Sequence, residues 1–215
     1  MSIQIRPATP ADVPILAQVQ LLAARSQLPR GLYDIMLDGP EPEILDFLEQ
    51  LLQTSTRSWA HYSTYLVAEL DGQPAAALCS YDPLERGGPL LEQAVTEVLT
   101  ARGLSEDEQV AFWQRFAPLA TCLPPDEQGA WIVETVATLP PFRRRGLIDR
   151  LVREALAQGR QRGYRCAQLT ALIGNTPAIQ AYEKVGFRVT QEHRHLDFEA
   201  VMGVPGTVRM ICPFV

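Results

Sequence analysis

A strand that runs into an arginine-rich turn and then a long amphipathic helix is the feature that most restricts how this 215-residue chain can fold. The apolar run from Ala130 to Leu139 is typical of a buried strand. The turn PPFRRRGLIDRLV follows at residues 140–152, and apolar residues then recur at helical spacing until Gly163, a helix stop. A second strand is expected at residues 165–172. This strand–helix–strand order supplies a parallel pair, so we expect an α/β protein with a mixed sheet.

The rest of the chain adds strands and helices around that unit. Spacing and turn signals predict strands at 3–6, 62–70, 73–81, 187–191 and 208–214, and helices after Pro10, at 43–53 and at 176–185. The dipeptide Asp71-Gly72 is a hairpin signal, whereas the Gly- and Pro-rich stretch 29–43 is predicted to be a loop. We expect one domain over residues 1–215, with a helical insertion at about 84–128.

The composition limits the class of partner. The formal net charge is −6 and the sequence pI is about 5.1, so phosphate backbones repel the chain and no nucleic-acid partner is expected. The same field favours cationic substrates such as amines. The four cysteines are scattered, as is typical of reduced thiols in a cytosolic protein. No apolar stretch has membrane-spanning length and no signal-peptide pattern is present, so we expect a cytoplasmic protein without a membrane partner.

The arginine turn has the chemistry of an anion site. A strand that passes through Gly146 into a helix presents backbone N–H groups, and those donors together with the helix dipole favour a phosphate. Arg143, Arg144 and Arg145 add planar cationic donors. The turn lacks the Gly-Lys-Ser/Thr ending of a P-loop and two of the three glycines of the dinucleotide fingerprint. Taken alone, it fits a pyrophosphate cradle and a solvated surface corner equally well.

A second stretch, LTALIGNTPAIQAYEKVGF at residues 169–187, gives the turn a context. It contains the complete pattern Asn-x-x-Ala-x-x-x-Tyr-x-x-x-Gly-Phe, formed by Asn175, Ala178, Tyr182, Gly186 and Phe187. With the turn before it, the chain resembles the GNAT superfamily of N-acetyltransferases, most closely over about residues 130–190. The resemblance implies a mixed, mostly antiparallel sheet with a splayed parallel strand pair, flanked by helices. It also implies acetyl-CoA as co-substrate, an amine acceptor and no metal.

The resemblance assigns cofactor contacts to three segments. The backbone of Val136, Ala137 and Thr138 would line the pantetheine arm, as an added strand does at a sheet edge. The pyrophosphate would be wrapped by Arg143, Arg144, Arg145, Gly146, Leu147, Ile148 and Asp149. Asn175 and Tyr182 are further contacts, although Asn175 can equally be the N-cap of the helix at 176. Ile148 stands where the family has Gly or Ala, and Arg144 replaces a frequent glycine.

Two residues are candidates for catalysis. Tyr182 matches the tyrosine of the family that protonates the departing thiolate, and its alternative role is core packing. Glu134 is a charged residue in an apolar strand and a candidate base, or else a structural carboxylate. Period-2 alternation predicts that it shares a strand face with Val136 and Thr138.

Several alternatives remain at the level of the sequence. A non-catalytic acyl-CoA-binding module on the same fold is the rival to an N-acetyltransferase, and Ile148 favours it. The motif His193-Arg194-His195 fits a polar strand end better than a metal site. The acceptor is not identified by any motif, and a homodimer is a further expectation because dimers are common in the resembled family.

Overall fold

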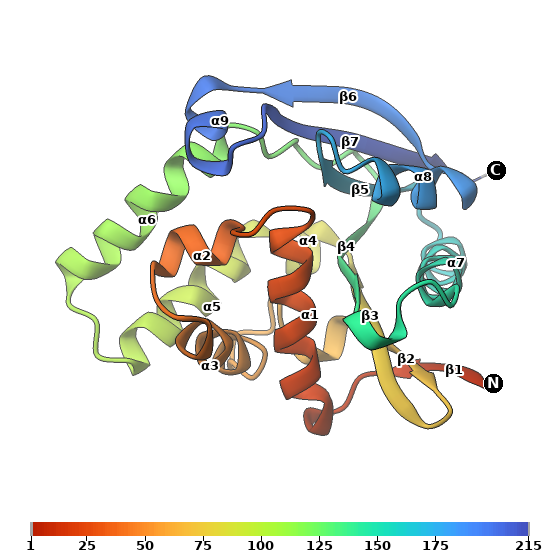
Figure 1. Cartoon of the computed structure of the whole chain (residues 1–215), viewed down its shortest axis with the longest axis horizontal. Coiled ribbons are helices and arrows are strands. Elements are labelled where there is room, and N and C mark those ends of the chain that lie inside the picture. Colours follow the sequence, from red (N-terminus) through yellow and green to blue (C-terminus); the bar gives the residue numbers. More distant parts are fainter. Residues whose placement is uncertain (1, 215) are drawn as a thin grey trace.

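The chain, described here over residues 2–214 of a computed structural model, folds around one seven-stranded mixed sheet with the order β1-β2-β3-β4-β5-β7-β6 (Figure 1). The strands are β1 (Ile3–Pro7), β2 (Tyr65–Leu70), β3 (Gln73–Tyr81), β4 (Ala130–Thr138), β5 (Cys166–Leu172), β6 (Arg188–Arg194) and β7 (Gly206–Pro213). Neighbouring strands run antiparallel except for β4 and β5, which are parallel. The predicted mixed, mostly antiparallel sheet is confirmed.

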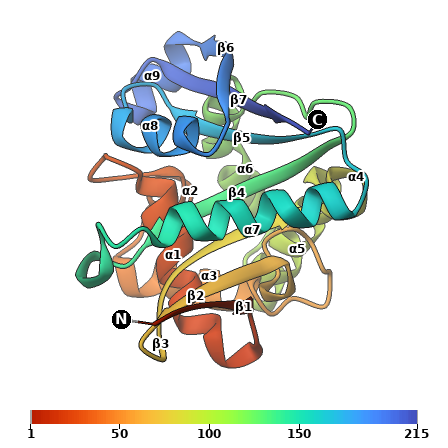
Figure 2. The same ribbon diagram turned by 90° about the vertical axis from the view of Figure 1, so that its right-hand side faces the viewer.

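Helices cover both faces of this sheet. They are α1 (Val13–Arg25), α2 (Leu32–Leu37), α3 (Glu41–Leu51), α4 (Pro83–Arg86), α5 (Gly88–Ala101), α6 (Glu106–Ala120), α7 (Leu147–Gln161), α8 (Thr176–Lys184) and α9 (Leu196–Met202), with 3-10 turns at Pro10–Asp12, Tyr62–Thr64 and Pro140–Phe142. On one face α1 packs against β3 and β4, and on the other α7 crosses β1 to β5 (Figure 2). β4 is therefore the middle strand of the sheet and is covered on both sides.

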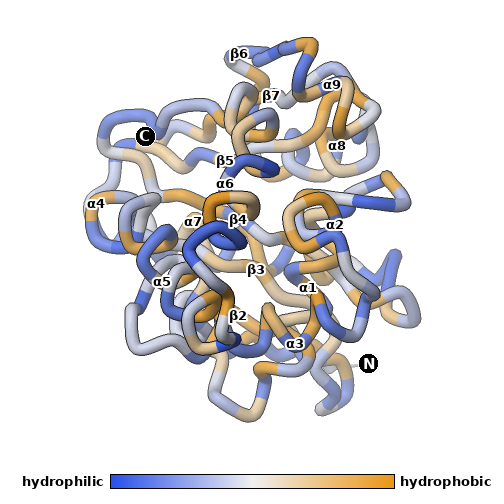
Figure 3. Tube along the Cα trace, turned by 90° about the vertical axis from the view of Figure 1, so that its left-hand side faces the viewer, coloured by the Kyte–Doolittle hydropathy of each residue, from blue (hydrophilic) through white to orange (hydrophobic). Residues whose placement is uncertain are grey.

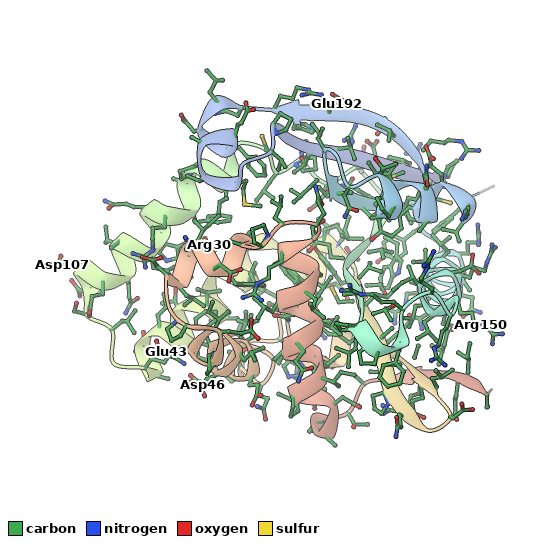
Figure 4. All side chains as sticks on the ribbon, in the orientation of Figure 1. Arg30, Glu43, Asp46, Asp107, Arg150 and Glu192 are labelled. Atoms are coloured by element: carbon green, nitrogen blue, oxygen red, sulfur yellow. The ribbon has the colours of Figure 1, made fainter. Side chains whose placement is uncertain are left out.

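The two faces carry separate apolar clusters. The cluster on the α1 face includes Leu16, Phe47 and Ile132, and the cluster on the α7 face includes Leu151, Val133 and Phe187. Figure 3 shows the apolar stretches of α1 and β3 inside the molecule and hydrophilic stretches in the outer loops. Charged side chains labelled in Figure 4 project outward from the loop before α2 and from α3, α6, α7 and β6. The predicted apolar stripe of α7 is confirmed, since Leu147, Leu151, Val152, Ala155 and Leu156 are all buried.

Two short helices were not predicted by the sequence. The stretch 29–43, expected to be a loop, contains α2. This helix forms because the Asp34 carboxylate accepts a hydrogen bond from the Gly31 N–H at 2.8 Å and an ion pair from Arg25 at 2.7 Å. α9 also lies in a segment without a predicted helix, and the side chain of His195 caps it. Both helices depend on polar contacts that a periodicity search does not detect.

Residues 84–128 form a helical arm beside the sheet. A capping box opens α6, because Ser105 and Glu108 exchange hydrogen bonds at its start. α6 runs from the end of α5 toward α9 and packs against α2 and α9 (Figure 1). The Arg115 guanidinium donates to the Met36 carbonyl at 2.7 Å, which fixes α6 to α2. The arm therefore connects the N-terminal helices with the C-terminal part of the sheet.

Candidate active site

The two parallel strands separate after three paired positions. β4 pairs with β5 only at Ala130–Ile132 and Cys166–Gln168, while β5 continues along β7 up to Leu172. Residues 133–138 of β4 and 169–172 of β5 therefore define an opening, the β4–β5 opening. Residues 134–139 all keep some exposed surface, although β4 is the middle strand of a sheet covered on both faces. A strand edge left accessible in this way can pair with an extended, amide-containing ligand.

A bulge at Thr135 interrupts β4 at the start of the opening. The register shifts between Ala77 and Cys79 of β3, so that β4 contributes one residue more than β3 over this stretch. Thr135 has a φ of 54°, in the left-handed region that a β-branched residue rarely adopts. Such a conformation costs about 1–3 kcal/mol and is typical of functional sites. A bulge of this kind redirects backbone groups away from the ladder and toward the opening.

Because of the bulge, the Glu134 side chain does not share a strand face with Val136, contrary to the prediction from the sequence. Glu134 is the cross-strand partner of Cys79, and Ala137 is the partner of Ala77, so these residues share the α1 face. Val136 packs with the cluster on the α7 face instead. The prediction that Glu134 shares a face with Val136 and Thr138 is therefore wrong, because the additional residue at Thr135 inverts the alternation.

The Glu134 side chain is partly buried and has no cationic partner among the groups that shift its pKa. Burial is the main cause that raises this pKa to about 7, and the negative charge of Asp126 adds to it. A hydrogen bond with the Tyr81 side chain acts in the opposite direction. A carboxyl with a pKa near neutral can both accept and release a proton at physiological pH, as a general base requires.

The arginine turn lies at the end of β4, where the sequence placed it. Arg144 has a φ of 64° and Gly146 a φ of 74°, and α7 begins at the next residue. Arg144 thus occupies a left-handed position, which explains why a glycine is frequent there in the resembled family. The Arg143 side chain reaches back to the Thr138 carbonyl at 3.5 Å and links the turn to the strand end. The first N–H groups of α7 and the exposed arginine side chains together suit an anion.

Two other residues of the turn have structural partners. Ile148 is partly buried and packs against the apolar cluster on the α7 face. Asp149 forms an ion pair with Arg153 at 2.9 Å, one turn further along α7. The charge of Asp149 is therefore partly balanced at the place where an anion would bind.

Tyr182 lies on α8, on the side of the sheet opposite to Glu134. It is 8% exposed, packs in the cluster on the α7 face and makes an edge-on contact with Phe187. Burial raises the pKa of its hydroxyl to about 12, so the group keeps its proton and can act as a donor. The packing role expected as an alternative is observed, and it is compatible with proton donation.

Asn175 is the N-cap of α8. Its Oδ1 accepts the Ala178 N–H at 3.3 Å, and its Nδ2 donates to the Ser26 hydroxyl at 2.6 Å. The capping role is confirmed, and the second bond fixes α8 to the end of α1. His195 caps α9 while His193 lies in β6, and none of the described residues forms a group of three or more potential metal ligands.

Three residues near Glu134 were not proposed from the sequence. Tyr33 of α2, Tyr81 of β3 and Asp126 of the loop before β4 all interact electrostatically with its carboxyl. Only Tyr81 had a signal in the sequence, because it ends a strand predicted to lie in the same sheet.

The helices within residues 2–214 are all too short or too polar to span a membrane.

Comparison with known proteins assigns the family. Residues 31–187 match the Acetyltransferase (GNAT) family. The chain therefore belongs to the GNAT family of acetyltransferases and is an acyltransferase, as the two sequence motifs predicted. A stretch of 52 residues is 50% identical to mycothiol acetyltransferase of Corynebacterium glutamicum, but it represents 24% of this chain and 18% of that protein. The chain thus matches less than a fifth of the length of this curated relative.

Solved structures support the same fold. A crystallised acetyltransferase has a TM-score of 0.71 with 19% identity, covering 98% of each chain. An N-acetyltransferase from Staphylococcus aureus Mu50 has a TM-score of 0.64 with 20% identity, covering 97% of this chain and 99% of its own. At this level of identity the similarity establishes the fold alone.

Proposed function

We propose that this acyltransferase transfers the acetyl group of acetyl-CoA directly to the nitrogen of a primary amine. The observation that carries the proposal is the β4–β5 opening, which leads from a partly buried carboxyl at one end to a cationic helix start at the other. A CoA thioester combines an amide-containing arm with a pyrophosphate. Those are the two groups that a free strand edge and a helix N-terminus bind.

The donor is held by the backbone of two segments. Val136, Ala137 and Thr138 offer their peptide groups to the pantetheine arm, and the turn 143–149 offers N–H groups to the pyrophosphate. The exposed guanidinium groups of the turn supply charge. The packing of Ile148 against the apolar cluster on the α7 face supports this cradle, because it directs part of the side chain away from solvent.

The chemistry needs one base, one oxyanion donor and one acid. An alkylammonium has a pKa near 10.4 and no free lone pair, so the amine must first lose a proton. Glu134 accepts this proton, directly or through water. A backbone N–H at the redirected segment after Thr135 donates to the oxyanion of the tetrahedral intermediate. Tyr182 donates a proton to the departing thiolate.

A ligand-dependent thermal shift tests the donor. At a hundredfold excess over Kd, acetyl-CoA should stabilise the protein by about 2.7 kcal/mol. For a chain of this size, this corresponds to a rise in Tm of roughly 5 to 10 °C. ATP and pantetheine serve as controls for the two halves of the ligand. Stabilisation by ATP alone, without a response to acetyl-CoA, would contradict the proposal.

A turnover assay tests the transfer. We expect a panel of primary amines to contain an acceptor that releases the CoA thiol and yields the acetylated amine. Tyr182→Phe should lower kcat by about 100-fold and leave the Kd of acetyl-CoA nearly unchanged. Tyr62→Phe removes a hydroxyl from a partly exposed tyrosine elsewhere and is the matched control. An unchanged kcat for Tyr182→Phe would exclude it as the acid.

A further inference from the structure

A side-chain hydrogen bond joins the two sides of the β4–β5 opening. The Asn175 Nδ2 donates to the Ser26 Oγ at 2.6 Å. Ser26 follows α1, which packs against β4, whereas Asn175 follows β5 and is the N-cap of α8. A Cβ added to Gly174 would lie 3.8 Å from the Gln27 Nε2, so the adjacent residues are neighbours as well (Figure 2). The turn after α1 thus connects the two strands that separate at the opening.

Ser26 has a backbone conformation that serine rarely adopts. Its φ is 56° and its ψ is −118°, and the Leu28 N–H donates to the Arg25 carbonyl at 2.8 Å. These angles match the first central residue of a type II′ turn, a position where glycine is preferred. A residue with a Cβ is strained there, and strain of this kind is typical of functional sites. Glycine would relieve the strain, but it has no hydroxyl to offer to Asn175.

The Ser26 hydroxyl fixes the orientation of the Asn175 side-chain amide. Ser26 donates its hydroxyl proton to the Gln27 Oε1 at 2.7 Å, so its oxygen accepts from the Asn175 Nδ2. The Asn175 Oδ1 accepts the Ala178 N–H at 3.3 Å. Both ends of the amide therefore have a partner, and the second Nδ2 hydrogen keeps a defined direction. Asn175 is also a candidate contact of acetyl-CoA, so this direction bears on the binding of the donor.

The turn that contains Ser26 is attached to both helices beside it. The Arg25 guanidinium at the end of α1 pairs with Asp34 of α2 at 2.7 Å. Gly31 packs directly on the last turn of α1, since a Cβ at this residue would collide with the Ala24 carbonyl oxygen. The place of Ser26 is therefore set by α1 and α2, and a hydrogen bond to Ser26 attaches α8 to this pair of helices.

We propose that the Ser26–Asn175 hydrogen bond is a clasp across the β4–β5 opening, and that Ser26 is a positioning residue which holds the opening in the form that binds the donor. The strand ladder joins β4 and β5 at one end of their parallel pair, and the clasp adds a connection beyond Leu172, the last residue of β5. The strained turn presents the hydroxyl to Asn175. The inference rests on the proposed function where it places acetyl-CoA in the opening.

Two variants at position 26 separate the hydroxyl from the backbone. Ser26→Ala and Ser26→Gly both remove the bond to Asn175, but only glycine adopts the turn without strain. Ser26→Gly should therefore melt roughly 2 to 4 °C above Ser26→Ala. The Kd of acetyl-CoA should rise roughly fivefold in both variants, because each loses one hydrogen bond of ordinary strength. Thermal denaturation and isothermal titration calorimetry measure the two quantities.

A double variant and a matched control test the pairing itself. Asn175→Ser keeps an N-cap for α8 but is too short to reach Ser26, so adding Ser26→Gly should not change the Kd further. Asp38 also has a positive φ, of 48°, and is exposed at the end of α2. Asp38→Gly relieves strain away from the clasp and should leave the Kd unchanged. Additive effects of Ser26→Gly and Asn175→Ser on the Kd would overturn the inference.

Hydrogen exchange tests the clasp without any ligand. The amides of residues 173–178 should exchange about fivefold faster in Ser26→Ala and Ser26→Gly than in the native protein, and at the native rate in Asp38→Gly. Unchanged exchange, an unchanged Kd in both Ser26 variants, or a Kd that follows Tm instead of the hydroxyl would overturn the inference. If acetyl-CoA binds to none of the proteins while exchange accelerates as expected, the proposed function fails and the clasp stands.

Discussion

Asp12 is a buried carboxyl group and Glu134 a partly buried one, both beside the central sheet, and their surroundings have opposite effects on the pKa. The Arg6 guanidinium donates two hydrogen bonds to Asp12, each of 2.8 Å, and lowers the pKa of this carboxyl to about 2. Thr9 adds two more donors at 2.7 and 2.9 Å. Within residues 2–214 no cation forms an ion pair with Glu134, and burial raises the pKa of its carboxyl to about 7. A paired guanidinium keeps Asp12 ionised, whereas burial without such a partner favours the protonated form of Glu134.

The difference follows from the strands that carry the two groups. Arg6 lies on β1, beside the Glu69 carboxylate of β2 at 2.7 Å, so one guanidinium connects two strands with the start of α1. Glu134 lies on β4, next to a strained bulge and opposite Cys79. An ionised carboxylate with a cationic partner stabilises the fold near the N-terminus, whereas an uncompensated one lowers the stability of the folded state.

The largest expected effect is the loss of activity in Glu134→Gln. The amide keeps the shape of the side chain but cannot accept the proton of the ammonium. We expect kcat/KM to fall by about 100-fold to 10,000-fold and the acid limb near pH 7 to disappear. In the native protein, activity rises with pH through this region because only the carboxylate is a base. Asp107→Asn is the control. A pH–rate profile in Glu134→Gln that keeps its acid limb would assign that limb to another group.

The second prediction concerns Asp12→Asn, which breaks the ion pair with Arg6 and leaves activity intact. Removing a bidentate, largely buried partner costs about 2 to 3 kcal/mol, or roughly 5 to 10 °C in Tm. The folded pKa of Asp12 is lowered, so its contribution is full above the ordinary value of 3.8. The contribution is lost as the pH falls toward 2. The difference in Tm between Asp12→Asn and the native protein should therefore disappear in acid. A constant difference over the whole range would refute the ionic explanation.

The third prediction concerns Glu134, where stability should change with pH in the opposite direction to that at Asp12. Its folded pKa is raised from 4.5 to about 7, so the folded state binds a proton more tightly than the unfolded state does. Stability falls as the pH rises from about 4.5 to 7 and stays reduced above this range. Glu134→Gln should therefore melt several degrees above the native protein at pH 8 and show little difference at pH 4.5. Thermal denaturation of both proteins at the two pH values decides the point.

The sequence predicts most of the fold because its local signals agree with the tertiary structure. Asp71 and Gly72 both adopt positive φ in the β2–β3 turn, as a two-residue hairpin requires. The apolar stripe of α7 and the capping box at Ser105 mark their helices without ambiguity. α2 was not predicted because it is only six residues long and is stabilised by an ion pair between its Asp34 and Arg25 of another helix.

The candidate site was predicted only where it is contiguous in sequence. The arginine turn and the segment from Asn175 to Phe187 are linear motifs, and the structure places them at the helix starts expected for them. The bulge at Thr135 could not be recognised in the sequence of β4, because the residue in the left-handed conformation is a threonine and not a glycine. Tyr81 and Asp126 reach Glu134 from other segments, so only the folded chain brings them together.

The smallest expected effect tests the geometry of the Asp12 site and leaves its charge unchanged. Arg6→Lys keeps a cation, but an ammonium cannot donate at once to both oxygens of Asp12 and to Glu69. We expect a loss of about 1 kcal/mol, measured as a fall of roughly 2 to 4 °C in Tm. Arg30→Lys is the matched control, because Arg30 pairs with Asp38 on the surface with both side chains more than half exposed.

The control variant should change Tm by less than about 1 °C, since exposed ion pairs contribute little to stability. If Arg6→Lys behaves like Arg30→Lys, charge alone keeps the Asp12 carboxyl ionised. The difference in pKa between Asp12 and Glu134 then depends only on whether a cation lies nearby. If the loss is as large as in Asp12→Asn, the fork geometry of the guanidinium accounts for the whole contribution, and a lysine near Glu134 would not suffice to convert that carboxyl into a structural one.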